Sequence, residues 1–353
     1  MKPVLFVTNL VPPDRAGAFA ALHAREGIEL ALFGGRSHHA TAGLDDPGVP
    51  HRHVTQRAVA RLAASRRYRA VVCGTAGRVA LPAAYAGARA GRVPFVLWSA
   101  LWADLDTPAH RAARPLLRRI HRGAGAVATY GEHVSAYARA QGARNVHVAP
   151  QAVDNAFWSA PVDRGSDGFT ALYVGRVAPG KGVDVLLEAW RTAGLARDGA
   201  TLRLVGPTPA ELSVAPGTGV DAVGPQAPAT VRNFLARTSV LVMPSVPTAS
   251  FREPWGLVAN EAMNQRIPVI ATDAVGAAAG GLVRDGRNGL VVRAGDPAAL
   301  AGALGHLHAH PVLGERLGAA GKQDVAAHTF DAWAAGMAAA LASATGLTPG
   351  RTC

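Results

Sequence analysis

Short runs of apolar residues recur along the chain, and each is followed by a longer segment whose composition suits a helix. Continuous apolar strands that alternate with helices are typical of parallel sheets covered on both faces. We expect strands at Val4–Thr8, Ile28–Phe33, Ala70–Cys73, Phe95–Trp98, Ala126–Thr129 and Val146–Ala149, followed by strands at Thr170–Gly175, Thr201–Val205, Val220–Val223, Val240–Pro244, Pro268–Thr272 and Gly289–Val292.

A segment rich in Pro, Gly and Asp separates these two sets of expected strands. It runs over Pro150–Gly168 and has the composition of a linker. A chain of 353 residues is long enough for two domains. We therefore predict an α/β protein with two doubly wound domains, the first over residues 1–155 and the second over 165–328.

Composition bears on the compartment. The two cysteines, Cys73 in an apolar run and Cys353 at the end, form neither a disulfide framework nor a metal cluster. The first apolar run is too short for a signal peptide. The run Ala332–Gly350 is poor in Leu, Ile and Phe, so a packed helix explains it better than a membrane span. A cytoplasmic location is expected.

The net charge of +12 is unevenly distributed. Residues 1–160 hold 20 Lys and Arg against 9 Asp and Glu, whereas residues 161–353 hold 16 against 15. Such an asymmetry concerns partners rather than fold, and it predicts that the N-terminal half meets something acidic.

Two clusters of arginine account for much of this charge. On a helix over Ala109–Gly125, four arginines share a face, Ala113, Leu116, Leu117, Ile120 and Ala124 fall toward a core, and Pro115 kinks or starts the helix. An anionic membrane surface and a purely solvated face both remain open; nucleic acid is disfavoured because no binding motif is present. The clusters are Arg111, Arg114, Arg118 and Arg122, and Arg57, Arg61, Arg66, Arg67 and Arg69.

Two carboxylates eight residues apart, Glu253 and Glu261, head the stretch Phe251–Val292. Pro254 suits the first turn of a helix that carries Leu257, Val258 and Met263 on its inner side. Glu253 then lies in the loop or first turn, and Glu261 about two turns further along. The amides of Gly256 and Leu257 would face an anion at the helix N-terminus. This pattern suggests a nucleotide-sugar site.

Two positive charges, Arg176 and Lys181, lie five residues apart among glycines in Gly175–Gly182. Arginine can bind two phosphate oxygens at once, and lysine supplies a point charge. Glycine lets the backbone approach the phosphate. The spacing is not that of a P-loop, and a solvated strand-to-helix turn is the alternative. Like Asn9–Gly17 and Ser245–Gly256, this loop follows an expected strand, where open α/β sheets bind ligands.

Several motifs in order resemble the C-terminal domain of family 4 retaining glycosyltransferases of actinobacterial type. They are ALYVGRVAPGKGVDVLLEAW from residue 171, EPWGLVANEAM from residue 253, PVIATDAVG from residue 268 and DGRNGLVV from residue 285. The match covers about residues 165–295, and the N-terminal half is only loosely similar. The resemblance implies a GT-B fold, with two Rossmann-like domains facing a central cleft. The first would bind the acceptor and the second the nucleotide sugar.

The resemblance also implies roles for individual residues. Arg176 and Lys181 match the pair that binds the donor diphosphate and neutralises the leaving nucleotide, so no metal ion or other cofactor is expected. Glu253 matches the carboxylate that meets the donor sugar, and Glu261 the one that holds the ribose. The remaining donor-binding positions are Gly17, Gly175, Gly256 and Leu257.

The N-terminal half departs from the family pattern. Relatives often have a histidine after the fourth strand, but Phe95–Asp104 contains none. Asp104, Asp106 and His110 are the candidates for the acceptor side, with His110 assigned provisionally as catalytic. The loop Gly276–Gly281 lacks the usual acidic residue, so the sugar is not specified. A C-terminal helix at about 329–353 is expected to pack back on the first domain, as in the family.

The leading hypothesis is a retaining transferase that moves a hexose-type sugar to a hydroxyl of a small molecule, such as a secondary metabolite, or of a saccharide or lipid-linked acceptor. Retention without an enzymic nucleophile fits a front-face mechanism. Peripheral contact with the inner face of an anionic membrane is one of the partner options. The competing classes are a nucleotide-sugar hydrolase or epimerase, a nucleotide-sugar binding module and a nucleic-acid binder; oligomeric state is left open.

Overall fold

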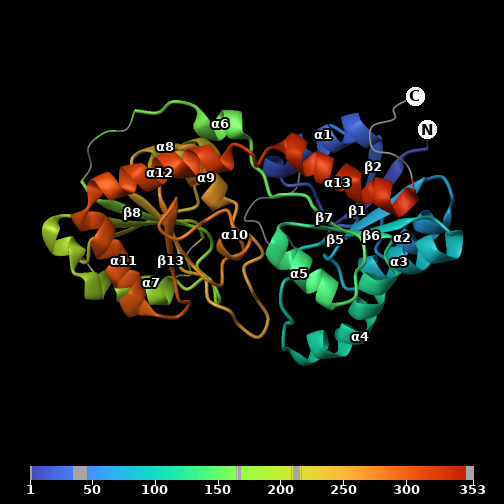
Figure 1. Cartoon of the computed structure of the whole chain (residues 1–353), viewed down its shortest axis with the longest axis horizontal. Coiled ribbons are helices and arrows are strands. Elements are labelled where there is room, and N and C mark those ends of the chain that lie inside the picture. Colours follow the sequence, from blue (N-terminus) through green and yellow to red (C-terminus); the bar gives the residue numbers. More distant parts are fainter. Residues whose placement is uncertain are drawn as a thin grey trace. The chain divides into compact units, whose positions relative to one another are not determined.

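The computed structural model describes residues 2–34, 46–163, 165, 168–207, 209, 215 and 217–346. These residues form two compact units (Figure 1). Unit 1 comprises Met1–Ala152 and Thr329–Cys353, and unit 2 comprises Val153–His328. Cys353 and the end of the expected C-terminal helix lie outside the described residues, as does part of the expected linker.

Unit 1 contains a seven-stranded parallel sheet in the order β3-β2-β1-β4-β5-β6-β7. Strand β1 pairs with β2 and β4, so that Val4 lies between Ile28 and Ala70. The strands are β1 (Val4–Thr8), β2 (Ile28–Leu32), β3 (His51–His53), β4 (Ala70–Gly74), β5 (Phe95–Ser99), β6 (Ala126–Thr129) and β7 (Val146–Val148).

Helices cover both faces of this sheet, because side chains alternate along each strand. Val4 and Phe6 face one core, which α1 and α13 complete; Leu5 and Val7 face the other, which α2 to α5 complete. Figure 1 shows α1 and α13 together on one side of the unit. The helices are α1 (Ala16–Glu26), α2 (Ala58–Ala64), α3 (Ala80–Gly91), α4 (Pro108–Gly123), α5 (Glu132–Ala140) and α13 (Phe330–Thr345), with a short 3-10 turn η1 (Pro13–Arg15).

Unit 2 contains a six-stranded parallel sheet in the order β10-β9-β8-β11-β12-β13. Helices α7 and α11 pack on one face, and α9 contacts α6, α8 and α12. The strands are β8 (Thr170–Val174), β9 (Thr201–Val205), β10 (Val220–Gly224), β11 (Val240–Met243), β12 (Val269–Thr272) and β13 (Gly289–Val292). The helices are α6 (Asn155–Ser159), α7 (Val183–Ala193), η2 (Leu195–Asp198), α8 (Pro228–Ala236), α9 (Val258–Asn264), α10 (Gly276–Ala279), α11 (Pro297–Ala309) and α12 (Pro311–Val325).

Local sequence signals fix several helix starts. The Thr107 side chain accepts a hydrogen bond from the amide of His110 at the start of α4, and Asp296 and Thr329 cap α11 and α13 in the same way. Such caps satisfy amides that the first turn leaves without partners. Proline opens α4 and α11, where the missing N–H costs nothing.

The expectation for α4 was wrong in part. Pro115 does not start the helix but lies inside it, where a kink stays a prediction. Leu116 does not face a core, because its side chain is 43% exposed, and the buried residues of α4 are Ile120 and His121. Only the second half of the helix therefore meets the core of unit 1.

Candidate active site

The loop after β8 carries the two predicted cations of unit 2. The Tyr173 hydroxyl donates a hydrogen bond to the Arg176 carbonyl at 2.7 Å and so fixes the start of the loop. Burial, followed by the nearby Glu253 carboxylate, raises the pKa of Tyr173, while Arg176 opposes this shift. The hydroxyl consequently stays protonated and keeps donating. Arg176 itself is half-buried, and no carboxylate of the described residues forms an ion pair with it.

Lys181 and Glu253 form an ion pair across 72 positions of the sequence. The Lys181 ammonium donates to Glu253 Oε2, and the Ser245 hydroxyl donates to the same oxygen at 3.2 Å. Both side chains are largely withdrawn from water, with 20% and 10% of their surfaces exposed. The ammonium also lies 5.1 Å from the centre of the Phe251 ring. Two of the loops predicted to hold ligands thus meet at one charged pair.

Glu253 lies in extended backbone rather than at a helix start. It forms a parallel bridge with Val275, and its carbonyl accepts from the Gly276 amide at 3.1 Å. The expected helix over Pro254 was wrong, since α9 begins only at Val258. Gly256 causes the delay: its φ of +91° lies in the left-handed region, which interrupts a right-handed helix.

The later start of α9 also changes the position of Glu261. This residue lies in the first turn of α9, not two turns along, and is half-buried. Nearby, Trp255 Nε1 donates to Asn260 Oδ1 at 2.8 Å, which ties the loop to the helix. Among the described residues, no side chain or backbone carbonyl accepts from the amides of Gly256 and Leu257. These amides lie between the extended Glu253 segment and the first turn of α9, which carries Glu261.

Gly17 has a packing role in unit 1. It is the second residue of α1 rather than a loop residue, and a Cβ atom there would lie 2.4 Å from the Phe330 ring. Its lack of a side chain therefore allows α13 to approach α1.

The candidates on the acceptor side are held in local structure. The His110 ring accepts or donates a bond with the Thr107 hydroxyl at 2.6 Å, next to the cap of α4. Asp104 accepts from the Tyr137 hydroxyl at 2.6 Å. Asp106 pairs with Arg111 and Arg114 at 3.3 and 3.2 Å. Each of the three side chains therefore has a local structural partner. A catalytic role for His110 stays a prediction.

A buried polar cluster in unit 1 did not figure in the predicted site. Arg15 is 7% exposed and donates to the Gln151 side chain, which is 136 positions away. Its guanidinium lies 5.8 Å from the centre of the Trp98 ring, and the Trp98 and Tyr130 rings are 5.7 Å apart. The sequence could have indicated Arg15, because it follows β1, where ligands of such sheets bind. It could not have indicated the partners of Arg15, because they are remote in sequence.

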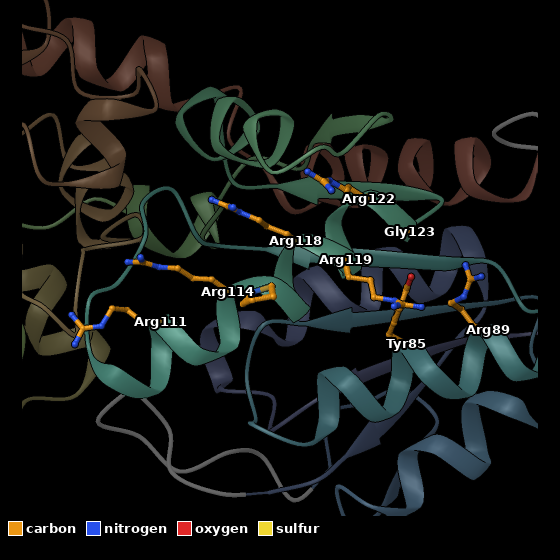
Figure 2. A pocket seen from close by; sticks show the side chains of 9 residues that line it. Tyr85, Arg89, Arg111, Arg114, Arg118, Arg119, Arg122 and Gly123 are labelled. Carbon is orange, nitrogen blue, oxygen red and sulfur yellow. The ribbon is translucent and has the colours of Figure 1, made fainter.

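The predicted arginine face of α4 borders a hollow of about 850 Å³ (Figure 2). Arg111 and Arg114 pair with Asp104 and Asp106. Among the described residues, no carboxylate pairs with the other arginines that line the hollow, which are Arg89, Arg118, Arg119 and Arg122. The hollow is lined by Arg89, Arg111, Arg114, Arg118, Arg119 and Arg122 together with Tyr85, Pro115 and Gly123.

Two features that are absent from the described residues concern metal ions and membranes. No group of three or more His, Cys, Asp or Glu side chains in the described ranges is arranged to hold a metal ion. Of the helices in those ranges, none has the length and apolar character needed to cross a bilayer.

The two parallel, doubly wound sheets and the likeness to solved structures show a GT-B fold, which confirms the predicted fold. A family model described as Glycosyl transferases group 1 matches residues 168–310. The matched residues include all four motifs, which confirms the resemblance seen in the sequence.

Curated relatives from actinobacteria carry one name, D-inositol 3-phosphate glycosyltransferase. The protein of Streptomyces scabiei is 34% identical over 191 residues, which is 49% of this chain and 41% of the relative. The protein of Acidothermus cellulolyticus is 38% identical over 160 residues, or 40% and 34% of the two chains. The chain thus spans about two fifths or less of the length of the relatives it matches.

Solved structures resemble nearly the whole chain. HepE of Anabaena, in complex with UDP and glucose, has a TM-score of 0.71 at 19% identity and covers 94% of this chain and 96% of its own. Sucrose-phosphate synthase of Thermosynechococcus elongatus has a TM-score of 0.70 at 18% identity, with 96% and 97% covered. At these identities the likeness establishes the fold.

Proposed function

We propose that the protein is a retaining glycosyltransferase that moves a hexose-type sugar from a nucleotide-diphosphate donor to a hydroxyl group, without a metal ion. The observation that carries the proposal is the Lys181–Glu253 ion pair. It joins a phosphate-binding type of loop to a carboxylate suited to sugar hydroxyls. The name of the actinobacterial relatives and the UDP and glucose bound to HepE support the same activity.

In this proposal, residues of unit 2 bind the diphosphate, the sugar and the ribose of the nucleotide sugar. The guanidinium of Arg176 and two remaining N–H donors of Lys181 bind the diphosphate, since an ammonium has three donors and Glu253 takes one. Glu253 accepts from a sugar hydroxyl, and Glu261 from the ribose. The amides of Gly256 and Leu257 donate to phosphate oxygens, and Gly175 lets the backbone approach. Gly17, at the start of α1, remains a proposed donor contact from unit 1.

The proposed reaction is a front-face displacement. The bond between the anomeric carbon and the phosphate oxygen breaks, and the acceptor oxygen bonds to that carbon from the same side. The acceptor proton passes to the leaving phosphate, so no enzymic nucleophile is needed. Arg176 and Lys181 stabilise the negative charge that grows on this phosphate, which is the kind of preorganised electrostatic help that contributes most to catalysis.

The acceptor is proposed to be a small molecule, a saccharide or a lipid-linked intermediate, with His110 as a candidate to orient its hydroxyl. The relatives' name makes a phosphorylated polyol the first acceptor to try. We place the enzyme in the cytoplasm, where nucleotide sugars are made.

The main test uses UDP-glucose as donor and D-inositol 3-phosphate as acceptor, with the anomeric configuration of the product read by NMR. We expect retention, whereas an inverted product contradicts the mechanism. Arg176→Ala should lower the rate by about 10²–10³-fold. The matched control is Arg191→Ala on α7, because Arg191 is exposed and, of the described residues, pairs with Glu188 alone. A thermal-shift screen of other nucleotide sugars identifies the donor if UDP-glucose fails.

The competing classes predict different products. A hydrolase or epimerase releases or converts the sugar with no acceptor consumed. A binding module is stabilised by the nucleotide sugar but turns nothing over. A nucleic-acid binder shows steep salt dependence with an oligonucleotide, and Glu253→Ala leaves that binding intact.

The arginine hollow supports a second proposal, peripheral contact with an anionic membrane. Several arginines there lack a carboxylate partner among the described residues, so they attract anionic headgroups. We expect the protein to float with phosphatidylglycerol vesicles and not with neutral phosphatidylcholine vesicles. The Arg119→Gln/Arg122→Gln variant should float less. Equal flotation of this variant and the wild type contradicts the proposal.

A further inference from the structure

Arg15 holds a buried cation for which unit 1 supplies no counter-ion. Its side chain is 7% exposed, and no Asp or Glu of the described residues lies within ion-pair distance. Nη2 donates to Gln151, but Nη1 is buried and has no hydrogen-bond partner. A buried charge without a partner is costly unless a ligand neutralises it.

The other shielded arginine of the same unit shows how such a charge is normally balanced. Arg69, with 13% of its side chain exposed, donates to the Glu26 carboxylate and, at 2.9 Å, to the Glu26 carbonyl. Arg52 likewise pairs with Glu29. Arg15 therefore differs from Arg69 and Arg52, and burial alone does not explain why it has no carboxylate partner.

A second N–H donor without a partner lies beside Arg15. Trp98 Nε1 is buried and makes no hydrogen bond, and the Arg15 guanidinium is 5.8 Å from the Trp98 ring centre. The Tyr130 ring lies 5.7 Å from that of Trp98. Trp98 and Tyr130 are only half-buried, so the cluster reaches the surface of unit 1 although both donor atoms are buried. Charged and neutral N–H donors in this arrangement suit the oxygens of an anion.

The cluster lies where this sheet is expected to bind ligands. The strand order reverses between β1 and β4. Arg15 follows β1 and immediately precedes the 11-residue helix α1, Trp98 is on β5, and Tyr130 follows β6. Ligands of doubly wound sheets bind at the carboxyl ends of strands near such a reversal. The positive end of the α1 dipole adds to the charge of Arg15.

We propose that Arg15 and Trp98 form an oxyanion-binding subsite in unit 1, which holds a phosphate or carboxylate group of a substrate. The Arg15 guanidinium donates through Nη1, and Trp98 Nε1 donates to a second oxygen. Calling the ligand a substrate rests on the proposed transferase function, whereas the site itself does not. The oxyanion comes either from the acceptor or from the donor diphosphate.

The test follows the indole N–H resonance of Trp98 during titration with inorganic phosphate. Its signal is assigned by its loss in Trp98→Phe. We expect this resonance to shift with phosphate in the wild type, and Arg15→Gln to weaken the apparent affinity at this resonance at least about tenfold. The matched control is Arg69→Gln, a shielded arginine with its own carboxylate, in which the phosphate shift should persist.

Arg15→Lys is a second test in case Arg15→Gln does not fold, because it keeps the positive charge but loses the planar guanidinium. It should bind phosphate with an affinity between those of the wild type and Arg15→Gln. The proposal is overturned if the Trp98 resonance of the wild type does not shift with phosphate. It is also overturned if the resonance shifts as much in Arg15→Gln as in the wild type. Because no turnover is measured, absence of sugar transfer refutes the proposed function and leaves this result intact.

A titration with UDP separates the two sources of the oxyanion. If Arg15→Gln weakens UDP binding about as much as Arg176→Ala does, the subsite serves the donor diphosphate. If UDP binding is unchanged while the phosphate response at Trp98 is lost, the subsite serves an anionic group of the acceptor. Either result supports an oxyanion site at Arg15.

Discussion

Each unit shields a cation near the ends of its strands, but the two units balance that charge differently. In unit 2, the Lys181 ammonium is paired with the Glu253 carboxylate. In unit 1, the Arg15 guanidinium has the Gln151 amide oxygen instead, and one of its nitrogens has no partner. The Lys181–Glu253 pair in unit 2 is thus neutral overall, whereas the Arg15–Gln151 pair in unit 1 carries a positive charge.

This difference indicates two ways of preparing for an anion. A paired lysine is held in position at low cost, and an incoming phosphate must share it with a carboxylate. An arginine without a carboxylate has no such competition, but its burial costs free energy until the anion arrives. The first arrangement favours stability before binding, and the second favours strong attraction.

The largest effect is expected from Lys181→Ala. It removes a proposed contact to the leaving phosphate, so the transfer rate should fall by about 10²–10³-fold. It also leaves the Glu253 carboxylate shielded without its cation, so the free energy of unfolding should fall by roughly 2 kcal/mol. Transfer assays and urea unfolding measure the two losses.

The double variant Lys181→Ala/Glu253→Gln separates these losses. Removal of the carboxylate charge should restore much of the stability but none of the activity. Recovery of the transfer rate in the double variant would mean that Lys181 only neutralises Glu253, and the contrast with Arg15 would disappear.

Gly17→Ala tests which of two roles Gly17 has. A Cβ atom 2.4 Å from the Phe330 ring forces that ring to move, so we expect a loss of about 1–2 kcal/mol of stability, measured by urea unfolding. Adding Phe330→Ala should reduce the specific penalty of the extra methyl group. A variant of unchanged stability that raises the KM for the donor would instead favour the predicted donor contact.

Tyr173→Phe removes one hydroxyl from the loop that carries Arg176. The lost hydrogen bond to the Arg176 carbonyl is buried in part, so stability should fall by about 1 kcal/mol. The loop should hold Arg176 less firmly, which raises the KM for the donor several-fold. If the KM is unchanged in steady-state assays, Arg176 is positioned by other contacts.

The smallest effect concerns pH and unit 1. Burial lowers the pKa of His121, and its hydrogen bond to the Leu117 carbonyl opposes this shift in part. The unfolded side chain takes up a proton near pH 6.5 while the folded one stays neutral, so acid favours unfolding. Stability should therefore fall from pH 7.5 to 5.5, and His121→Gln should reduce that fall. Equal falls in both proteins would show that other groups set it.

Most of the fold was predictable, because buried parallel strands leave a direct signature in the sequence. Every strand expected from an apolar run is present, with ends that differ by one residue at most. The sheet edge β3 was missed because its sequence, His51–His53, contains no apolar residue. A short polar edge strand is set by its neighbour β2 rather than by its own composition.

The candidate site was predictable only where it depends on local sequence. Glycines with Arg176 and Lys181 in one loop predict a phosphate site from local sequence alone. The Lys181–Glu253 and Arg15–Gln151 contacts join residues 72 and 136 positions apart, and no local pattern encodes such pairs. The start of α9 was misplaced because a helix pattern does not reveal the positive φ of Gly256.

The position of α13 has a consequence for the order in which the protein folds during synthesis. Trp333 and Met337 complete the core beside β1, yet residues 153–328 separate that helix from the rest of unit 1. Domains usually fold as the ribosome delivers them, first the N-terminal one. Here unit 2 is contiguous and can close its core first, while the earlier-made sheet of unit 1 has only α1 to cover the face on which α13 will pack. The nascent chain is therefore most exposed to aggregation on the face of β1 that bears Phe6.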